Sequence, residues 1–532
     1  MTGRILAHRH RLITDDNSRW WTLGAMCFAL FMIMLDNTVV NVALPSIQRD
    51  LHASLSALEW TVNAYTLTFA VLMVTGGRLG DIFGRRRMFL FGVIVFGVSS
   101  AAIGLAPNDT MLVAFRAVQG IGAAFMMPAT LSIITQAFPP HQRGMAIGTW
   151  AGVSAMALAI GPVLGGFLTE QVSWRAIFFI NPPIAVLALG VTLFAARETR
   201  DETVAKTVDY PGIAALTVGL TTLVLALVEG NTWHWGSPRI IALFAVAAVS
   251  LAAFFPIERR VKAPMVDFAF FRSRSFLGAN MVAFIVTFAM LSQFFFLALY
   301  MQNFLHFSPL QAGIRFLPST LIIIVMGPIA GRLTDRIGPR PLITLGLLIV
   351  AGALFIQSRM TVHTGYGLLL PGFVMMGLGM GLVMSPMTTS AMNAVDRTKA
   401  GLASGVTSMS RMVGGTFGVA VMGALVTTIG RSELDSRIPY VPAATRGALA
   451  NALGSGAVPT GHGTSAQTVS AVRHAFVSAL STGLTIGAAV TVIGAFTALA
   501  LIQRAPRRAE TPQTAQAPKT GQSAAEAELT VA

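Results

Sequence analysis

The sequence has little charge and few of the residues that build catalytic or metal sites. Only 11% of its 532 residues are charged, nine are histidine, and Cys27 is the single cysteine. One cysteine excludes internal disulfides and cysteine-rich metal sites, and all nine histidines fall in expected loops or tails. The chain shows no phosphate-binding loop and no nucleophile triad pattern, so we expect no enzyme activity, no bound metal and no ATP-driven step.

Apolar residues, in contrast, are abundant. They make up 54% of the chain, and the mean hydropathy is +0.68. A water-soluble domain cannot bury that fraction, so most of the chain must face lipid or neighbouring membrane-spanning helices. The formal net charge of +15 comes from Lys and Arg clustered in short loops instead of on one basic face, which argues against nucleic acid as a partner.

Stretches of about 20 mostly apolar residues predict membrane-spanning helices. The first such stretch is too long for a signal peptide, carries Asp36 and has no small-residue cleavage site after it, so we expect it to be retained. Fourteen stretches qualify and predict an all-α polytopic membrane protein: 21–44, 57–77, 88–106, 110–137, 144–169, 175–196, 211–229, 238–257, 276–301, 310–330, 341–358, 366–392, 401–428 and 476–502.

The distribution of cations predicts the orientation of these spans. With the N-terminus inside, most of the 37 Lys and Arg fall in cytoplasmic segments, as the positive-inside rule requires. We therefore expect both termini in the cytoplasm. The polar stretch 429–475 then lies outside, with a short helical piece near 443–453, and the tail 503–532 has the composition of a disordered segment.

A charged segment occurs twice, first at 76–87 and again, altered, at 330–340. The two copies are called the first and second hinge below. Their offset is 254 residues without a gap, and the same offset relates Leu51, His52 and Ser54 to Leu305, His306 and Ser308. Because both hinges lie between long apolar stretches, the repeat predicts two related helical bundles, which is the plan of a secondary transporter.

The repeat and the spans together divide the chain. In a fourteen-helix topology, each hinge follows the second helix of a six-helix bundle, and two further helices separate the bundles. The expected parts are a cytoplasmic N-terminus (1–20), a first bundle (21–200), two additional helices (201–262), a second bundle that includes the outside loop (263–502) and a cytoplasmic tail (503–532).

Three charged residues inside the predicted spans, Asp36, Arg116 and Glu59, are candidates for proton coupling, because charge is costly in a bilayer and usually marks a functional site. Asp36 lies about 15 residues into its helix, ~23 Å along the axis, and Arg116 lies at a similar depth in the fourth helix. If the two helices line one cavity, the pair can exchange partners as a proton or a substrate arrives. The alternatives are a structural hydrogen bond for Asp36, capping of carbonyls for Arg116 and a place at the membrane interface for Glu59.

The hinges and the fifth span contain small residues at informative places. Glycines permit a tight turn, and Asp81 can cap the following turn or bridge to a cation of the other bundle, whereas topogenic charge alone explains only the arginines. The residues expected to act in the hinges are Gly77, Arg78, Gly80, Asp81, Gly84, Arg85, Arg86 and Arg87, with Asp335 and Gly338 in the second copy. In the fifth span, Gly161, Pro162, Gly165 and Gly166 permit close helix contact and a bend, and generic packing is the alternative.

These motifs resemble the major facilitator superfamily, and within it the fourteen-helix drug:proton antiporter branch. The resemblance covers roughly residues 20–505. It rests on segments that match, in order, that branch's motifs for helix 1, the helix 2–3 loop, helix 4, helix 5 and the entry to helix 6: 35–45, 77–87, 116–122, 161–166 and 174–183.

The resemblance implies export of drugs or metabolites from a bacterial cytoplasmic membrane, driven by inward proton flow, with Arg116 and Asp36 in the coupling path. It implies no cofactor and an alternating-access mechanism, and we expect a monomer in the lipid bilayer. Because acids other than Asp36 and Glu59 are scarce in the spans, monovalent lipophilic cations or uncharged amphipaths are the expected substrates. From helix position alone, the cavity between the bundles would be lined by Trp60, Asn63, Tyr65, Gln119, Asn280, Gln293 and Phe294.

Other functions remain open at this point. A dedicated exporter of one native metabolite, such as an antibiotic, siderophore, lipid or amino acid, would share every motif. A proton-coupled importer is disfavoured by the glycine–proline pattern of 161–166, and a non-transporting receptor by the presence of Asp36, Arg116 and the first hinge. The second hinge departs from the pattern, since Pro339 replaces an arginine and leaves Arg340, so we expect weaker interactions there.

Overall fold

The computed structural model describes residues 17–200, 209–230, 233–261, 264, 266, 268–395, 400–454 and 465–503. These ranges are helical with short connections and contain no strand. The expected N-terminal segment before residue 17 and the expected tail after residue 503 lie outside the described residues.

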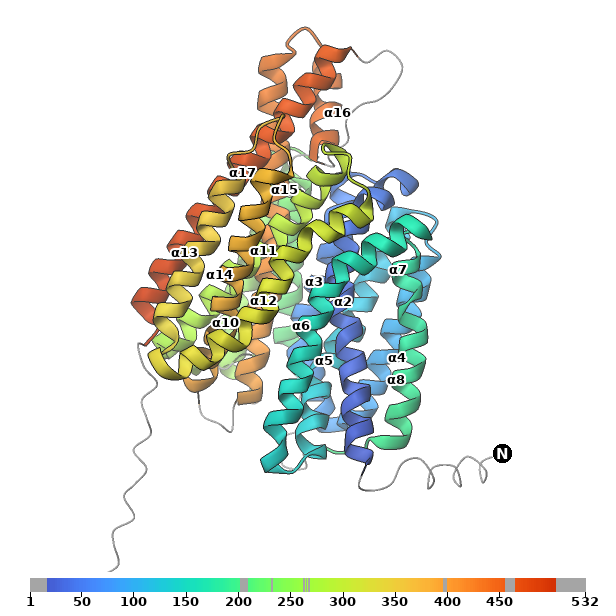
Figure 1. The fold of residues 1–532 in the computed structure, drawn as a ribbon, viewed down its shortest axis with the longest axis vertical. Coiled ribbons are helices and arrows are strands. Elements are labelled where there is room, and N and C mark those ends of the chain that lie inside the picture. Colours follow the sequence, from blue (N-terminus) through green and yellow to red (C-terminus); the bar gives the residue numbers. More distant parts are fainter. Residues whose placement is uncertain are drawn as a thin grey trace, which may run out of the picture.

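The first half of the chain forms one group of helices (Figure 1). Backbone groups in a bilayer have no water to bond, so apolar segments of this length must satisfy them as helices. The elements are α2 (Ser18–Leu51), α3 (Leu55–Phe83), α4 (Arg85–Gly104), α5 (Asp109–Ala137), α6 (Pro140–Gln171), α7 (Ala176–Phe179) and α8 (Asn181–Ala195).

The second half forms a similar group beside it, after two further helices (Figure 1). Those two are α9 (Tyr210–Glu229) and α10 (Pro238–Arg260), which pack against each other. A short 3-10 helix, η1 (Phe268–Arg272), precedes the second group, which contains α11 (Arg274–Asn303), α12 (Pro309–Ile337), α13 (Pro339–Gln357), α14 (Tyr366–Asn393), α15 (Ala400–Arg437), α16 (Ala443–Gly454) and α17 (Ala466–Leu501).

Thirteen of the described helical segments are long and apolar enough to cross a membrane, judged by length and composition. They coincide with thirteen of the predicted spans. The remaining prediction, 144–169, falls on α6, which is helical over Pro140–Gln171 but includes side chains outside the described residues. That α6 is also a span therefore stays a prediction.

The last two long helices extend further than expected. We expected a polar loop over 429–475, but α15 continues to Arg437 and α17 begins at Ala466. Between them, α16 covers the short helical piece that the sequence predicted. These segments project beyond the other helices at one end of the molecule, called the α16 side below, opposite the start of α2 and the end of α17 (Figure 1).

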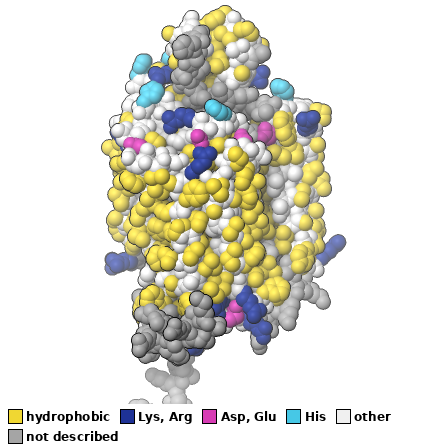
Figure 2. All heavy atoms as spheres, turned by 90° about the vertical axis from the view of Figure 1, so that its right-hand side faces the viewer, with side chains coloured by type: hydrophobic (Ala, Val, Ile, Leu, Met, Phe, Trp, Pro, Cys, Tyr) yellow, Lys and Arg dark blue, Asp and Glu magenta, His cyan; other side chains and the backbone are white. Residues whose placement is uncertain are grey.

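The surface agrees with a membrane protein. In the view of Figure 2, hydrophobic side chains cover the middle of the molecule, while Lys, Arg, Asp, Glu and His gather toward its two ends. Exposed apolar residues such as Val98, Val186, Val249 and Phe496 are 64%, 66%, 70% and 65% accessible. Exposure of this kind is compatible with lipid as the surrounding solvent and not with water.

The repeat is visible in the backbone. His52 and His306 both adopt left-handed conformations, with φ of 51° and 56°. Each precedes a serine that caps the next helix: Ser54 accepts from Ala57 N, and Ser308 accepts from Gln311 N. The two hinges turn at Gly84 and Gly338, with φ of 111° and 82°. Positive φ explains why glycine occupies both positions.

The two bundles meet along two seams, each formed by one helix from either bundle. In the first seam, α3 packs on α15, where Thr66 Oγ1 and Thr416 Oγ1 share a hydrogen bond of 2.7 Å. In the second, α6 packs on α12, and a Cβ added to Gly166 would lie 2.5 Å from Pro309 O. Such short backbone approaches require small residues.

Candidate functional site

Asp36 of α2 and Arg116 of α5 form a fully buried ion pair. Arg116 Nη1 donates to Asp36 Oδ2 at 2.5 Å, and both side chains are at most 1% accessible. Helices α2 and α5 run in opposite directions. Asp36 and Arg116 therefore lie at the same depth although they are at different distances from the starts of their helices. The sequence predicted that Asp36 and Arg116 could interact if their two helices lie side by side, and the structure shows that they do.

Three further groups complete this cluster, which we call the charged node. Gln119 Nε2 donates to Asp36 Oδ1 at 3.0 Å, and Gln119 Oε1 accepts from Arg116 Nη1 at 2.8 Å. Arg116 Nε donates to the backbone oxygen of Thr61 at 2.8 Å, and its guanidinium carbon lies 4.3 Å from the centre of the Tyr65 ring. Both carboxylate oxygens are thus hydrogen-bonded, and a cation–π contact supports the arginine.

Glycines bring the helices close enough to build the node. A Cβ at Gly120 would lie 2.5 Å from the backbone oxygen of Tyr65, so only glycine lets α5 approach α3 in this way. In α6, a Cβ at Gly161 would lie 1.9 Å from Thr38 Oγ1, and one at Gly165 would lie 2.8 Å from the backbone oxygen of Val39. The predicted close contact of this helix is therefore with α2, next to Asp36.

The same segment of α6 also contacts the second bundle. Pro162 lies opposite Gly313 of α12, where an added Cβ would be 2.1 Å from Pro162 O. Gly166 lies against Pro309 and Leu310, as described above. The small residues at 161–166 therefore alternate between a face toward the node helix α2 and a face toward the other bundle.

Glu59 is buried between helices near the start of α3. It is 1% accessible, and its Oε1 atom has no hydrogen-bond partner among the described residues. It contacts α15, because a Cβ at Gly423 would lie 1.6 Å from Glu59 Oε1. Glu59 is thus separate from the charged node and lies on the α3–α15 seam.

The first hinge is held by contacts within its own bundle. Arg85 Nη2 and Nε donate to Asp81 Oδ1 at 2.7 and 2.9 Å. Glu198, which follows α8, accepts from the backbone N–H groups of Arg86 and Arg87 at 3.0 and 3.1 Å. Asp81 therefore pairs with a neighbouring cation, and an acid that the sequence did not single out caps the start of α4.

The second hinge retains the turn with fewer described side-chain contacts. Gly338 caps α13, which begins with Pro339. Proline at the first helical position has no N–H to satisfy and presets the backbone angle. The side chain of Asp335 lies outside the described residues, so its expected role stays a prediction.

The predicted cavity residues separate into two groups. Tyr65 and Gln119 belong to the charged node, and Asn63, on the same helix as Tyr65, is fully buried. The other four lie elsewhere, and each contacts a neighbouring helix. Trp60 packs with Val224, Val228 and Ala420, and Asn280 accepts a hydrogen bond from Ser410 Oγ. Gln293 donates to Gln357 Oε1 at 2.5 Å, and the rings of Phe294 and Phe316 stack with centres 4.8 Å apart.

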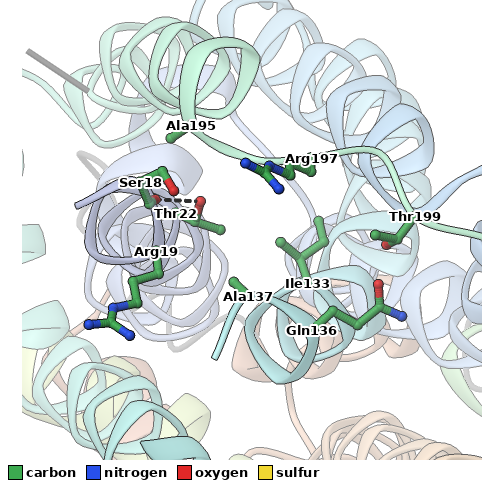
Figure 3. Close-up of a pocket in the computed structure, with 9 residues that line it drawn as sticks. All are labelled: Ser18, Arg19, Thr22, Ile133, Gln136, Ala137, Ala195, Arg197 and Thr199. Atoms are coloured by element: carbon green, nitrogen blue, oxygen red, sulfur yellow. Dashed lines mark hydrogen bonds between the residues drawn. The ribbon is translucent and has the colours of Figure 1, made fainter. Parts of the chain in front are cut away.

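A hollow at the end opposite the α16 side contains none of these residues. Figure 3 shows that it lies between the start of α2, the end of α5 and the segment after α8. Arg197 points toward Thr22 across it, and Thr22 Oγ1 donates to the backbone oxygen of Ser18. Within the described residues, no group of three His, Cys, Asp or Glu side chains could hold a metal ion.

The structure also shows two polar contacts between the bundles that sequence reasoning missed. Gln302 Nε2 of α11 donates to the backbone oxygen of Val42 in α2 at 2.8 Å. Glu170 Oε2 at the end of α6 accepts from the backbone N–H of Leu310 at the start of α12 at 3.0 Å. The sequence could have pointed to Glu170, because it is an acid shortly after the glycine–proline segment 161–166. Nothing in the sequence pointed to Gln302.

Comparison with known proteins identifies the family. The model of the Major Facilitator Superfamily matches residues 26–419. The "Tetracenomycin C resistance and export protein" of Streptomyces glaucescens is 36% identical over 489 residues, which cover 90% of this chain and 91% of that protein. The "Multidrug resistance protein Stp" of Mycobacterium tuberculosis is 37% identical over 407 residues, 76% of this chain and 75% of that protein.

Solved structures agree on the fold. A bacterial homolog to the human lysosomal transporter Spinster, in an inward-facing and unoccupied conformation, matches with a TM-score of 0.61 and 18% identity over 91% of this chain and 98% of that chain. Together with the helical architecture, the family match and the relatives show that the protein is a membrane transporter and not an enzyme, and that it belongs to the Major Facilitator Superfamily.

Proposed function

We propose that this transporter exports amphipathic or lipophilic cationic compounds in exchange for protons. The observation that carries the proposal is the charged node, a carboxylate with two occupied oxygens buried at membrane depth beside an arginine. Buried ionisable groups in membrane proteins mark ion and substrate paths. The relative named for tetracenomycin C resistance and export supports the direction of transport, and the "Puromycin resistance protein pur8" of Streptomyces alboniger, 37% identical, is named for resistance.

The node has two mutually exclusive hydrogen-bond arrangements. In the ionised state, Asp36 accepts from Arg116 and from Gln119, while Gln119 also accepts from Arg116. If Asp36 Oδ1 carried a proton, its O–H donor would face the N–H donor of Gln119. If the Gln119 amide then turned over, its NH₂ group would face the N–H donors of Arg116. Protonation of Asp36 therefore rearranges the whole node, because no single side chain can absorb the change.

This coupling suits antiport. A proton arriving at Asp36 removes the negative charge that holds Arg116 and would attract a cationic substrate. Loss of that proton restores the charge. Proton and cationic substrate thus compete for one carboxylate, which supports monovalent cations as substrates.

In the proposed orientation, the α16 side faces outward and both termini face the cytoplasm of a bacterial cell. The Lys and Arg at the opposite end, which include Arg85–Arg87 and Arg259–Arg260, support this orientation through the positive-inside rule. The multi-pass architecture supports the cytoplasmic membrane as the location, with the transporter acting as a monomer.

A dedicated exporter of one native compound is the second candidate. It is favoured by the names of relatives that each refer to a single antibiotic, such as tetracenomycin C and puromycin. Both candidates use the same node and differ in the breadth of the cavity. A narrow substrate profile in the assay below would favour this second candidate.

The test is ethidium movement in proteoliposomes under an imposed pH gradient, with Asp36→Asn against the unchanged protein. We expect gradient-driven transport that is lost in Asp36→Asn, since an amide cannot release a proton. The matched control is Asp50→Asn on the same helix, because Asp50 also accepts from an arginine, Arg175, but is 47% accessible.

Each outcome decides something. Coupled transport that survives Asp36→Asn would contradict the role of the node and move attention to Glu59. Transport of ethidium without any response to the gradient would contradict proton coupling. Failure to move ethidium, with gradient-driven movement of a single natural antibiotic, would favour the dedicated exporter.

A further inference from the structure

Glu59 occupies an unusual position for a carboxyl group. It projects from α3 of the first bundle onto α15 of the second. Its Oε1 atom lies 1.6 Å from the position that a Cβ at residue 423 would occupy, so a side chain there would clash with the carboxyl. Glycine at 423 is therefore what allows the carboxyl to enter the seam. The side chain is 1% accessible, and Oε1 has no hydrogen-bond partner among the described residues.

No cation faces this carboxyl from the helices packed around it in the described part of the chain. Its electrostatic neighbour is another acid, Glu229 of α9, whose Oε1 accepts from Ser56 Oγ. On α2 and α5, Asp36 and Arg116 are engaged with each other.

The cations of the packed helices are also engaged or remote. Arg49 of α2 donates to Pro45 O and Ser46 Oγ, Arg437 of α15 pairs with Glu433, and Arg411 of α15 lies 12 residues before Gly423, ~18 Å along the axis. Arg446 of α16 pairs with Asp435 at 2.6 Å. Arg431 of α15 is exposed and lies about two helical turns beyond Gly423, ~12 Å along the axis. Glu59 therefore has a like charge nearby and no described counter-ion within its seam.

An ionised carboxylate in this place would be strongly unfavourable, because a buried charge needs a counter-ion or hydrogen bonds on both oxygens. A neutral carboxyl still benefits from hydrogen bonds, but it costs far less to bury because it carries no net charge. The closed seam thus requires a proton on Glu59, and ionisation favours a state in which α3 and α15 separate and water reaches the group.

The surroundings show which contacts opening would break. Further along the seam, Thr66 and Thr416 are joined by a hydrogen bond, and Val74 packs on Gly405. On the α16 side, Gln302 and Glu170 each form a hydrogen bond between the bundles, and Gly166 of α6 packs against Pro309 and Leu310 of α12. Opening that side requires these contacts to break.

We propose that Glu59 is a second protonation site that acts as a latch: its neutral form closes the α3–α15 seam on the α16 side, and its ionised form opens it. The proton passes between the Glu59 carboxyl and water on that side, with no other bond made or broken. The inference rests on the proposed antiport, to which it adds a step: protons from outside would close the transporter after substrate has left.

The test measures the seam directly. In the full-length protein with Cys27→Ser, nitroxide labels at Thr110→Cys of α5 and Ser432→Cys of α15, both exposed on the α16 side, report the distance between bundles by pulsed electron paramagnetic resonance. Without substrate, we expect the distance to lengthen as the pH rises. Glu59→Gln should stay at the short distance throughout, and Glu229→Gln should keep a pH response.

A second variant acts in the opposite direction. Gly423→Ala places a methyl group where the carboxyl sits, so it should hold the seam at the long distance at every pH. A pH response in Glu59→Gln equal to that of the parent, or no response in the parent, would overturn the latch. Because this readout needs no transport, ethidium transport that ignores the pH gradient together with a Glu59-dependent opening rejects only the antiport, and gradient-driven transport without a Glu59-dependent opening rejects only the latch.

Discussion

The two bundles share a backbone plan but differ at their centres. The first holds the charged node of Asp36, Arg116 and Gln119, fully buried. At the centre of the second, Phe316 contacts Phe294 and Phe373 at 4.8 and 5.2 Å. Beside these rings, the amides of Gln293 and Gln357 bond to each other.

This difference separates two tasks that the duplicated fold could have shared. A carboxylate can gain a proton and change its partners, whereas an aromatic cluster offers only a large apolar surface with fixed packing. We therefore expect proton chemistry to belong to the first bundle and apolar substrate contact to the second. The backbone features that repeat, the left-handed histidines and the hinge glycines, set the turns and leave the side chains free to diverge.

The strongest way to break this comparison is to remove the cation of the node. Arg116→Met leaves the Asp36 carboxylate buried without a counter-ion, and we expect a loss of ~3–5 kcal/mol in unfolding free energy together with loss of gradient-driven transport. Unfolding in detergent and flux in proteoliposomes measure the two effects. Phe373→Leu, the counterpart change in the second bundle, should leave the dependence on the gradient intact.

A double variant controls for simple misfolding. Asp36→Asn combined with Arg116→Met removes both charges, so most of the lost stability should return while coupled transport stays absent. If the double variant is as unstable as Arg116→Met, the arginine acts mainly through packing, and the contrast between a charged and an apolar centre loses its basis.

The meeting of the two bundles provides a test of intermediate size. Gly166→Ala would place a Cβ 2.5 Å from Pro309 O and 2.6 Å from Leu310 Cα, both backbone atoms of α12. We expect a cost of about 1–3 kcal/mol from overpacking and a lower transport rate, because the seam must shift. Gly152→Ala on the same helix meets nothing within 4 Å and should be close to neutral in both assays.

The hinges give the smallest expected effect. Glu198→Ala removes the acceptor for two N–H groups at the start of α4, for which we expect a loss of about 0.5–2 kcal/mol. At the equivalent positions the second hinge has Arg340 and Pro341, and Pro341 has no N–H group that needs an acceptor. Arg87→Ala, whose side chain is 77% accessible and 3.8 Å from Glu198, should change unfolding by under ~0.5 kcal/mol. An equal loss in both variants would mean that charge, and not capping, holds the first hinge.

Much of the architecture was predictable because lipid leaves the backbone few choices. Thirteen spans follow from hydropathy, and the repeat of the hinges locates the two bundles. The end of α15 and the start of α17 were not predicted, since polar helices outside a membrane carry no hydropathy signal. The Asp36–Arg116 pair could be anticipated from depth, but Gln119 as its third member could not, because depth does not specify which face of a helix a residue occupies.

The sequence by itself determined that this chain is a duplicated helical transporter with a rare acid and a rare arginine at matching depths. Only the tertiary structure decided how they act: that Gln119 closes the node, that Glu198 caps α4 and that Glu59 enters α15 at Gly423. The physical reason is the sequence separation over which each kind of interaction acts. Hydropathy and turn chemistry act along the chain, whereas pairing of buried polar groups depends on close contact between helices whose residues are up to hundreds of positions apart.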